Sequence, residues 1–343
     1  MFGSRVVVST YNSLKDKLKL CYQGITNFPR WYQRQILIFI HYFVDLKYKV
    51  QHIKETNFNL GLEHLHKNNL NDAILRFKLV EKFFAPKDPE ANYWLGWTYF
   101  LKNNYTKALA HLLQSFEADQ VKLGVFLQNY QNLTEIPQPI WRQYKNLTAP
   151  YYADKFYNHN KLHLPYTFIN KTITAITNLP DTYRILELGS NVGLIGYEVR
   201  KRFPDYFTVT GVESAKAMNI LVPLYYTNLN IYDQLIEASI PDFLQENSDK
   251  YDVILSWNSL SFTKDLTKYF TLIYSSTSPL GYFAFCLPIA TAPSFSIGGK
   301  EFISTIEEIN SALTQAKFII LSNEELELEK KSRYYMVVCK KNN

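Results

Sequence analysis

Cysteine is scarce in this chain of 343 residues. Its three cysteines, Cys21, Cys286 and Cys339, are widely spaced and form no Cys-x-x-Cys pair. Such usage argues against a disulfide framework and against a cysteine-based zinc site, and it is typical of a reducing compartment. We therefore expect a cytoplasmic protein that holds no structural metal.

Long apolar runs are also missing. The longest, Ile36–Val44, has nine residues and includes His41, whereas a bilayer-spanning helix needs roughly 20. The N-terminus has no apolar segment followed by a small-residue cleavage site, so we expect neither a signal peptide nor a transmembrane segment. The helix expected over Trp31–Gln51 could cap a helical domain or lie in a membrane interface. Its nearly unbroken apolar run favours burial.

Charge is unevenly distributed, although no block of like charges occurs. Residues 1–180 carry 22 Lys and Arg against 12 Asp and Glu, a net charge of +10, and residues 181–343 carry 15 against 19, a net charge of −4. A basic half can indicate an acidic partner. A solvated, lysine-rich helical surface is the simpler interpretation, and no base-reading motif accompanies the charge. A nucleic acid is therefore the less favoured partner, though still an open one.

An internal repeat lies between residues 56 and 119. Leu60-Gly61 recurs as Leu95-Gly96, Lys67-Asn68-Asn69 as Lys102-Asn103-Asn104, and Ala73 as Ala108, always 35 residues later. A period of about 34 residues with Leu-Gly in a first helix and Ala in a second resembles the tetratricopeptide repeat. The small residues would let paired helices approach closely, with Phe77 and Leu112 filling the interface. These repeats predict a surface that binds a protein or peptide partner.

Two repeats alone bury little surface, so flanking helices should cap them. Candidates are Trp31–Gln51 and Val121–Gln131. The expected organisation is N-terminal capping helices over 1–55, two tetratricopeptide-like repeats over 56–120, a helical connector and cofactor lid over 121–180, and an α/β domain over 181–343. The lid is expected between Tyr151 and Tyr166, where Tyr and Phe are dense.

From Arg184 onward, short β-rich runs alternate with helical stretches, which predicts a doubly wound, Rossmann-like and mostly parallel sheet. Continuous apolar runs within them indicate strands that are covered on both faces. Seven strands are expected: Arg184–Leu188, Phe207–Glu213, Gln234–Ala238, Tyr251–Trp257, Gly281–Leu287, Phe318–Ser322 and Tyr334–Cys339.

The segment Arg184–Gly196, RILELGSNVGLIG, carries the strongest functional signal. A buried strand ends at Glu187 and turns through Gly189 and Gly193 into a helix. This Glu-x-Gly-x-x-x-Gly spacing differs from the Gly-x-Gly-x-x-Gly of dinucleotide sites. It suits S-adenosylmethionine (SAM), because an acidic strand end can serve the α-amino group and the N–H groups of the turn can serve the carboxylate.

A second acidic strand end follows the first. Glu213 lies 26 residues after Glu187, at the end of the next strand, where a carboxylate can accept hydrogen bonds from both ribose hydroxyls. Met218 could pack its thioether on the adenine face. The acidic turn, the second acidic strand end and the buried fourth strand, in this order, predict a SAM site more specifically than one glycine-rich turn would.

With these motifs, the chain resembles class I SAM-dependent methyltransferases, in particular predicted ones with N-terminal tetratricopeptide repeats. The resemblance covers Tyr151 to Leu287, through APYYADKFYNHNKLHLPY, ILELGSNVG, GVESAKAM, YDVILSWNSL and LGYFAFCLP. It implies SAM as cofactor, with Glu187, Gly189, Ser190 and Gly193 at the methionine portion. It further implies a cofactor-binding set that includes Asn191, Glu213, Ser214, Met218, Ser239, Trp257, Tyr152, Phe156 and Tyr166, with the three last-named aromatic residues folding over the cofactor.

Four positions depart from the family's pattern: Asn191 replaces the second glycine of the turn, Ser239 replaces an aspartate, Leu280 replaces a proline, and Tyr157 replaces the aspartate that follows Phe156. The departures at Asn191, Ser239 and Leu280 leave open an alternative function, an interaction scaffold with a vestigial methyltransferase fold.

The methyl acceptor is not encoded in a recognisable motif. No Asn/Asp-Pro-Pro-Tyr sequence follows the fourth strand, which ends Ser256-Trp257-Asn258-Ser259, and no histidine follows His163. Because methyl transfer from a sulfonium needs mainly orientation, the missing base is compatible with catalysis. We therefore expect a SAM-dependent methyltransferase with unassigned catalytic residues, acting on a small molecule or a protein.

Overall fold

The computed structural model describes residues 29–115, 118–157, 163–203, 206–296, 300–328 and 332–342. The chain divides into two compact units, Met1–Asn59 and Leu60–Asn343. In the described ranges, no helix combines the length and the apolar character that crossing a membrane requires. The four-part organisation expected from the sequence is finer than this division and stays a prediction.

Helix α2, Arg30–Gln51, dominates the described part of the first unit. Its large apolar side chains are exposed; they include Ile38, Phe39, Tyr42 and Phe43, each more than half accessible. The helix was expected, and the burial of its apolar run stays a prediction. Apolar residues occupy several faces of the helix, so one helical neighbour could cover only part of them.

The boundary between the units falls inside α3 (Ile53–His66), and the second unit starts at Leu60 of this helix. Two helix pairs follow from there: α3 with α4 (Leu70–Leu79), and α5 (Pro89–Leu101) with α6 (Tyr105–Leu112). A Cβ atom on Gly61 would lie 2.6 Å from the Phe77 ring, and one on Gly96 would lie 2.5 Å from Leu112 Cγ. The turns match as well, since Asn68 and Asn103 have φ of 59° and 60°. Both glycine contacts and both turns are related by the 35-residue offset.

One feature of this region was not expected. Helix α4 continues into a π-helix, Val80–Phe84, before Pro89 opens α5 with Asp88 as its N-cap. Helix α7, Leu123–Asn129, and a 3-10 turn, Tyr130–Asn132, follow the second pair. Helix α8, Gln138–Tyr157, then leads to α9, His163–Ala175. The predicted lid therefore begins inside α8 and ends inside α9, and its residues 158–162 lie outside the described ranges.

A seven-stranded sheet forms the centre of the second unit, with strand order β3-β2-β1-β4-β5-β9-β8. The first five strands are parallel, β9 is antiparallel to both of its neighbours, and so the sheet is mostly parallel, as predicted. The strands are β1 Tyr183–Leu188, β2 Phe207–Val212, β3 Gln234–Ile236, β4 Tyr251–Trp257, β5 Thr277–Ile289, β8 Phe318–Leu328 and β9 Ser332–Lys341.

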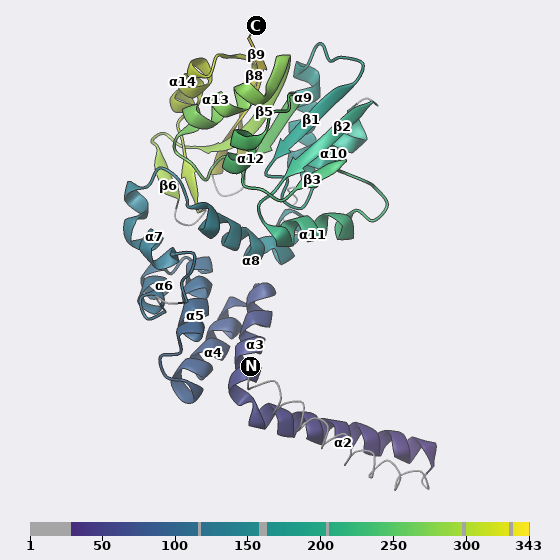
Figure 1. Cartoon of the computed structure of the whole chain (residues 1–343), viewed down its shortest axis with the longest axis vertical. Coiled ribbons are helices and arrows are strands. Elements are labelled where there is room, and N and C mark those ends of the chain that lie inside the picture. Colours follow the sequence, from purple (N-terminus) through teal and green to yellow (C-terminus); the bar gives the residue numbers. More distant parts are fainter. Residues whose placement is uncertain are drawn as a thin grey trace. The chain divides into compact units, whose positions relative to one another are not determined.

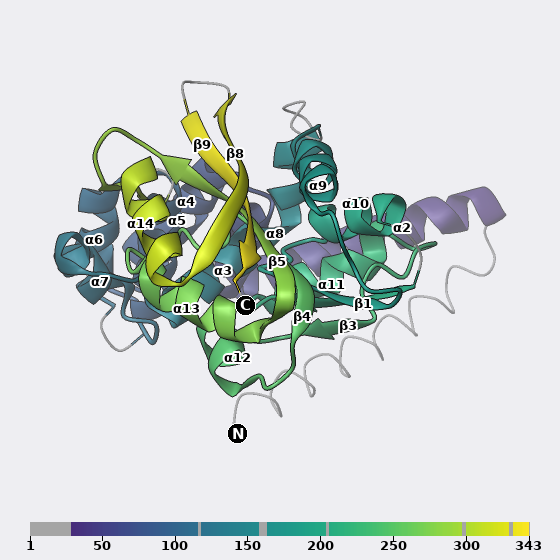
Figure 2. The ribbon, with the colours of Figure 1, turned by 90° about the horizontal axis from the view of Figure 1, so that it is seen from above.

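Helices cover both faces of this sheet (Figures 1 and 2). On one face lie α9, α10 (Leu194–Arg202) and α11 (Lys216–Tyr225), and on the other lie α12 (Ile240–Glu246), α13 (Leu266–Ser276) and α14 (Ile306–Gln315). The central strands β1 and β4 are buried along most of their length, which explains their continuous apolar sequences.

Helix α8 lies across the edge of the sheet at which the parallel strands end (Figure 1). The segment before it is attached to the loop after β4: Ile136 N–H donates to Phe262 O at 2.8 Å, and Lys264 N–H donates to Thr134 O at 2.7 Å. A short antiparallel strand pair that the sequence did not predict, β6 (Ser294–Ser296) with β7 (Glu301–Ile303), follows β5. Ligands of open α/β sheets bind at this carboxyl edge, so α8 covers the expected position of the site.

Candidate cofactor site

The turn after β1 has the backbone conformation that its glycines predict. Gly189 and Gly193 have φ of +74° and +86°, and Asn191 has φ of +48°. The left-handed region is costly for most side chains but accessible to Gly and Asn. The amide groups of Gly189 and Ser190 donate to Val212 O at 2.8 and 3.0 Å, which joins the turn to the end of β2. Asparagine in place of the second glycine therefore fits this turn.

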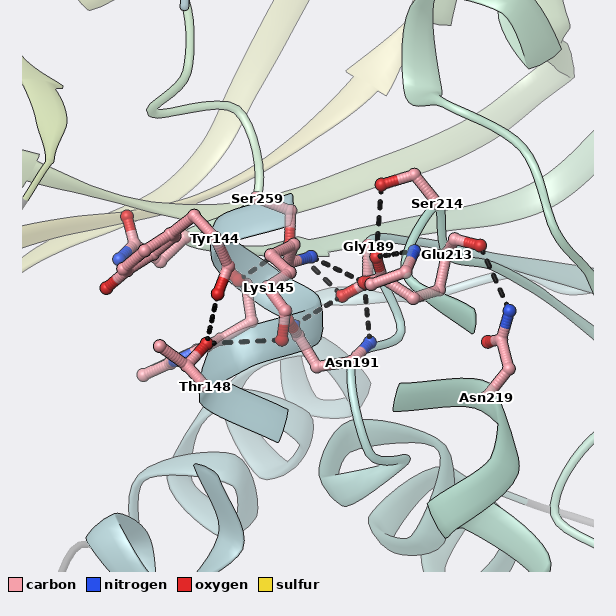
Figure 3. Close-up of polar contacts among 12 residues, drawn as sticks. Tyr144, Lys145, Thr148, Gly189, Asn191, Glu213, Ser214, Asn219 and Ser259 are labelled. Carbon is pink, nitrogen blue, oxygen red and sulfur yellow. Dashed lines mark hydrogen bonds and ion pairs between the residues drawn. The ribbon is translucent and has the colours of Figure 1, made fainter. Parts of the chain in front are cut away.

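Glu213 follows β2 and is buried beside this turn. Its Oε2 atom accepts from Asn191 N–H at 3.2 Å and from Lys145 Nζ at 2.5 Å, and its Oε1 atom accepts from Ala215 N–H at 2.9 Å. Lys145 comes from α8, points at the carboxylate (Figure 3), and is itself 7% exposed. The carboxylate expected to bind ribose is thus held in an internal ion pair.

Helix α8 makes further contacts around the ion pair. Asn146 Oδ1 accepts from Ala217 N–H at 3.0 Å, which satisfies an amide at the start of α11. Ala149 joins an apolar cluster with Val192, Ala215 and Met218, and Tyr152 packs against that cluster. Burial and the nearby Glu213 carboxylate raise the pKa of Tyr152. The structure therefore brings Glu213, Met218 and Tyr152 together, as the predicted site requires.

Glu187 lies at the end of β1, beneath the turn. Its Oε2 atom accepts a hydrogen bond from Tyr232 Oη at 2.8 Å, and the residue is 2% exposed. Burial raises the pKa of Glu187 to about 8, although hydrogen bonds from Tyr232 and the Gly196 amide oppose this shift. A Cβ on Gly196 would lie 2.6 Å from the Tyr232 hydroxyl, so this glycine makes room for the tyrosine. The partner of Glu187 is therefore a tyrosine from the β2–β3 region.

Little space remains between α8 and the carboxyl edge of β1 and β2. A cavity of about 10 Å³ is lined by Gln138, Trp141 and Lys145 of α8, and on its other side by Gly189, Val212, Glu213, Ser214, Ile240 and Phe262. This volume holds one water molecule at most, whereas small-molecule sites measure roughly 300–1,000 Å³. The residue types around Glu213 suit an adenosine, and α8 packs against them with only this small cavity between.

The remaining predicted residues are more dispersed. Ser214 Oγ donates to Glu213 Oε1 at 3.3 Å, and Ser190 is buried in the turn. Ser239 caps α12 by accepting from Asp242 N–H at 3.2 Å. Trp257 packs edge-on against Phe168 within a hydrophobic core cluster of the sheet domain. The side chain of Phe156 lies outside the described set.

Tyr166 is placed away from the site. The Arg202 guanidinium carbon lies 3.9 Å from the centre of its ring, and the tyrosine is 42% exposed. Arg202 is the last residue of α10, a helix that starts at the carboxyl edge of the sheet and runs to the opposite edge. In this structure α9 thus holds Tyr166 beside the end of α10, and its expected role over the cofactor stays a prediction.

Of the residues of α8 that face the site, the sequence analysis named Tyr152 and missed the others. Trp141, Lys145, Ala149 and Tyr152 lie at spacings of four, four and three residues, which places them on one face of a helix. The sequence alone shows that these four residues share one face of a helix. It does not show that this face contacts Glu213, which lies 68 residues beyond Lys145.

The end of β4 contributes another position that the sequence did not single out. Asn258 has φ of +48°, and its Nδ2 atom donates to Glu301 Oε2 at 3.2 Å. Its Oδ1 atom is buried and has no hydrogen-bond partner among the described residues. Those residues contain no group of three or more His, Cys, Asp or Glu that could hold a metal ion.

Comparison with known proteins identifies the class of this domain. Residues 157–320 match the family model described as a methyltransferase domain. None of the curated proteins compared with the chain matches it.

Similar solved structures cover about half of the chain or somewhat more. A SAM-dependent methyltransferase from Leishmania major is 15% identical, with a TM-score of 0.49 over 63% of this chain and 90% of that one. Geranyl diphosphate C-methyltransferase from Streptomyces coelicolor A3(2) is 12% identical, with a TM-score of 0.45 over 54% of this chain and 80% of that one.

The family match agrees with the strand order and with the turn after β1. The matched segment, residues 157–320, is therefore a SAM-dependent methyltransferase domain.

Proposed function

We propose that this chain transfers a methyl group from SAM to an acceptor that reaches the ends of β4 and β5, and that its helix pairs bind a protein or peptide partner, which can be the acceptor itself. The observation that carries the proposal is the position of Glu213. A buried carboxylate at the end of β2, joined to the turn after β1 through the Asn191 amide at 3.2 Å, suits the hydroxyls of a ribose.

Different residues of the chain would bind different parts of the cofactor. Glu213 would accept from the ribose, Met218 and Ile240 would border the adenine, and the turn Gly189–Gly193 would hold the methionine portion. Ser190, Ser214 and Tyr152 complete the proposed set. The sulfonium of SAM supplies an activated methyl group, and the protein's task is to align the acceptor with it.

Asn258 is the group proposed to meet the acceptor. It follows β4, at the carboxyl edge of the sheet, and its Oδ1 atom is buried without a hydrogen-bond partner in the described part of the chain. An unpaired buried carbonyl oxygen costs free energy, which a donor on a ligand would recover. An amide or amine N–H, or a hydroxyl, is therefore the acceptor chemistry that the position favours.

The helix pairs are connected to the same edge of the sheet, which supports a role in presenting a partner there. Lys300, next to β7, donates to Asn103 Oδ1 in the turn of the second pair at 2.8 Å. Phe295 of β6 packs against Phe126 and Tyr130. A partner held on the helix pairs would thus lie near the loops that follow β4 and β5.

Transfer of a labelled methyl group tests the proposal. The full chain is incubated with methyl-tritiated SAM and a cell lysate, beside Glu213→Ala and the matched variant Glu237→Ala, which changes an exposed carboxylate after β3. We expect the wild type and Glu237→Ala to label the same species, and Glu213→Ala to label it at least tenfold more slowly. Equal labelling by all three would remove Glu213 from the site. Absence of labelling, together with absence of SAM binding, would favour the scaffold alternative.

A further inference from the structure

Lys145 of α8 occupies the position beside Glu213 that the proposed cofactor would need. The ammonium group of Lys145 lies 2.5 Å from Glu213 Oε2, where the proposed ribose hydroxyls would donate their hydrogen bonds. A lysine ammonium is a donor of three hydrogen bonds and no acceptor, so it satisfies the carboxylate as a diol would. Both side chains are nearly inaccessible, at 9% and 1% exposure.

We propose that Lys145 and α8 form an autoinhibitory latch: Lys145 occupies the ribose subsite, and SAM binds only when Lys145 releases Glu213. This inference rests on the proposed cofactor site. The latch competes with SAM within one molecule, so the apparent affinity equals the intrinsic affinity reduced by the fraction of open molecules.

The contacts of α8 suggest how the latch opens and closes. The segment before α8 is fixed, because Glu135 accepts from Lys268 Nζ at 2.9 Å and from Tyr269 Oη at 2.7 Å. Further along, Pro150 interrupts the hydrogen bonding inside the helix, since proline has no N–H to donate. The part of α8 that carries Lys145 therefore lies between an anchored start and a weak point, an arrangement suited to a limited movement (Figure 3 shows this part of the helix).

Burial of the ion pair also couples the release of Lys145 to the binding of a ligand. A buried charge whose partner is removed is strongly unfavourable. In the closed state Lys145 and Glu213 satisfy each other, and in the cofactor-bound state the ribose hydroxyls satisfy Glu213 while Lys145 must turn toward solvent. Opening is thus coupled to the arrival of a ligand that offers donors to Glu213.

Binding of S-adenosylhomocysteine (SAH), measured by calorimetry on the full chain, tests the latch. Lys145→Met removes the competing ammonium and should bind SAH at least tenfold more tightly than the wild type. Lys145→Arg keeps the cation and should resemble the wild type, as should Arg142→Met, a change at an exposed position of the same helix. Should Lys145→Met fail to fold, Lys145→Gln keeps a hydrogen-bond donor, removes the charge and should also bind more tightly.

The outcomes separate the latch from the cofactor assignment. Wild-type binding with equal or weaker affinity in Lys145→Met and Lys145→Gln would overturn the latch and leave the SAM site in place. Absence of SAH binding in every variant, with the fold intact by circular dichroism, would overturn both. Tighter binding by both uncharged variants and unchanged binding by Lys145→Arg would establish the latch.

Discussion

The buried carboxyl group of Glu187 should make the stability of this protein fall as pH rises. Burial raises the pKa of Glu187 from 4.5 to about 8, and the group accepts a hydrogen bond from Tyr232. Between these two values the folded state keeps a proton that the unfolded state has lost. The contribution of Glu187 to stability is therefore complete below pH 4.5 and is lost as pH rises toward 8.

Glu187→Gln should remove this dependence, because glutamine resembles the protonated acid and can still accept from Tyr232. One pKa unit corresponds to about 1.4 kcal/mol. Because Glu187 ionises in the unfolded state and stays protonated in the folded state, the free energy of unfolding of the wild type falls by on the order of 3 kcal/mol between pH 4.5 and pH 7. Urea unfolding at pH 5 and at pH 7.5 measures the difference. The variant should gain stability relative to the wild type as pH rises, and exposed Glu246→Gln should not. A difference that is the same at both pH values would refute this account of Glu187.

Two further predictions concern the helix pairs. Gly96→Ala should destabilise the protein by ~1–3 kcal/mol, since its Cβ would lie 2.5 Å from Leu112 Cγ. Adding Leu112→Ala to this variant should recover part of the lost stability, as measured by urea unfolding. Additive losses from the two substitutions would contradict the contact. Ala108→Leu, at a fully buried position, should cost ~1–3 kcal/mol, whereas Ala110→Leu on the exposed face of the same helix should be nearly neutral. Equal effects of the two substitutions in thermal unfolding would argue against the proposed register.

Local patterns in the sequence predicted much of the fold. Tyr251–Trp257 was expected residue for residue, because a strand buried on both faces is a continuous apolar run. Gly61 and Gly96 were expected at helix contacts, and the structure places them against Phe77 and Leu112. In the turn after β1, Gly189, Asn191 and Gly193 all adopt positive φ, which their residue types permit. Each of these features depends on neighbours in the chain.

Features that depend on distant residues were not predicted. The ion pair of Lys145 and Glu213 joins positions 68 residues apart, and no local pattern around either residue predicts the contact. The hydrogen bond from Tyr232 to Glu187 is of the same kind. Glu187 was assigned to the cofactor on sequence grounds, and only the structure shows its tyrosine partner. Burial of α2 was expected from its apolar run, but composition does not state which neighbour covers a helix.

Titration of the wild-type chain with SAH, and separately with NAD, tests the central claim most directly. The acidic ends of β1 and β2 and the turn between β1 and α10 predict saturable heat with SAH at one site per chain, and none with NAD. Calorimetry at millimolar ligand covers the weak binding expected of a latched site. Binding of NAD, or absence of SAH binding in both the wild type and Lys145→Met, would contradict the assignment of this domain's cofactor site.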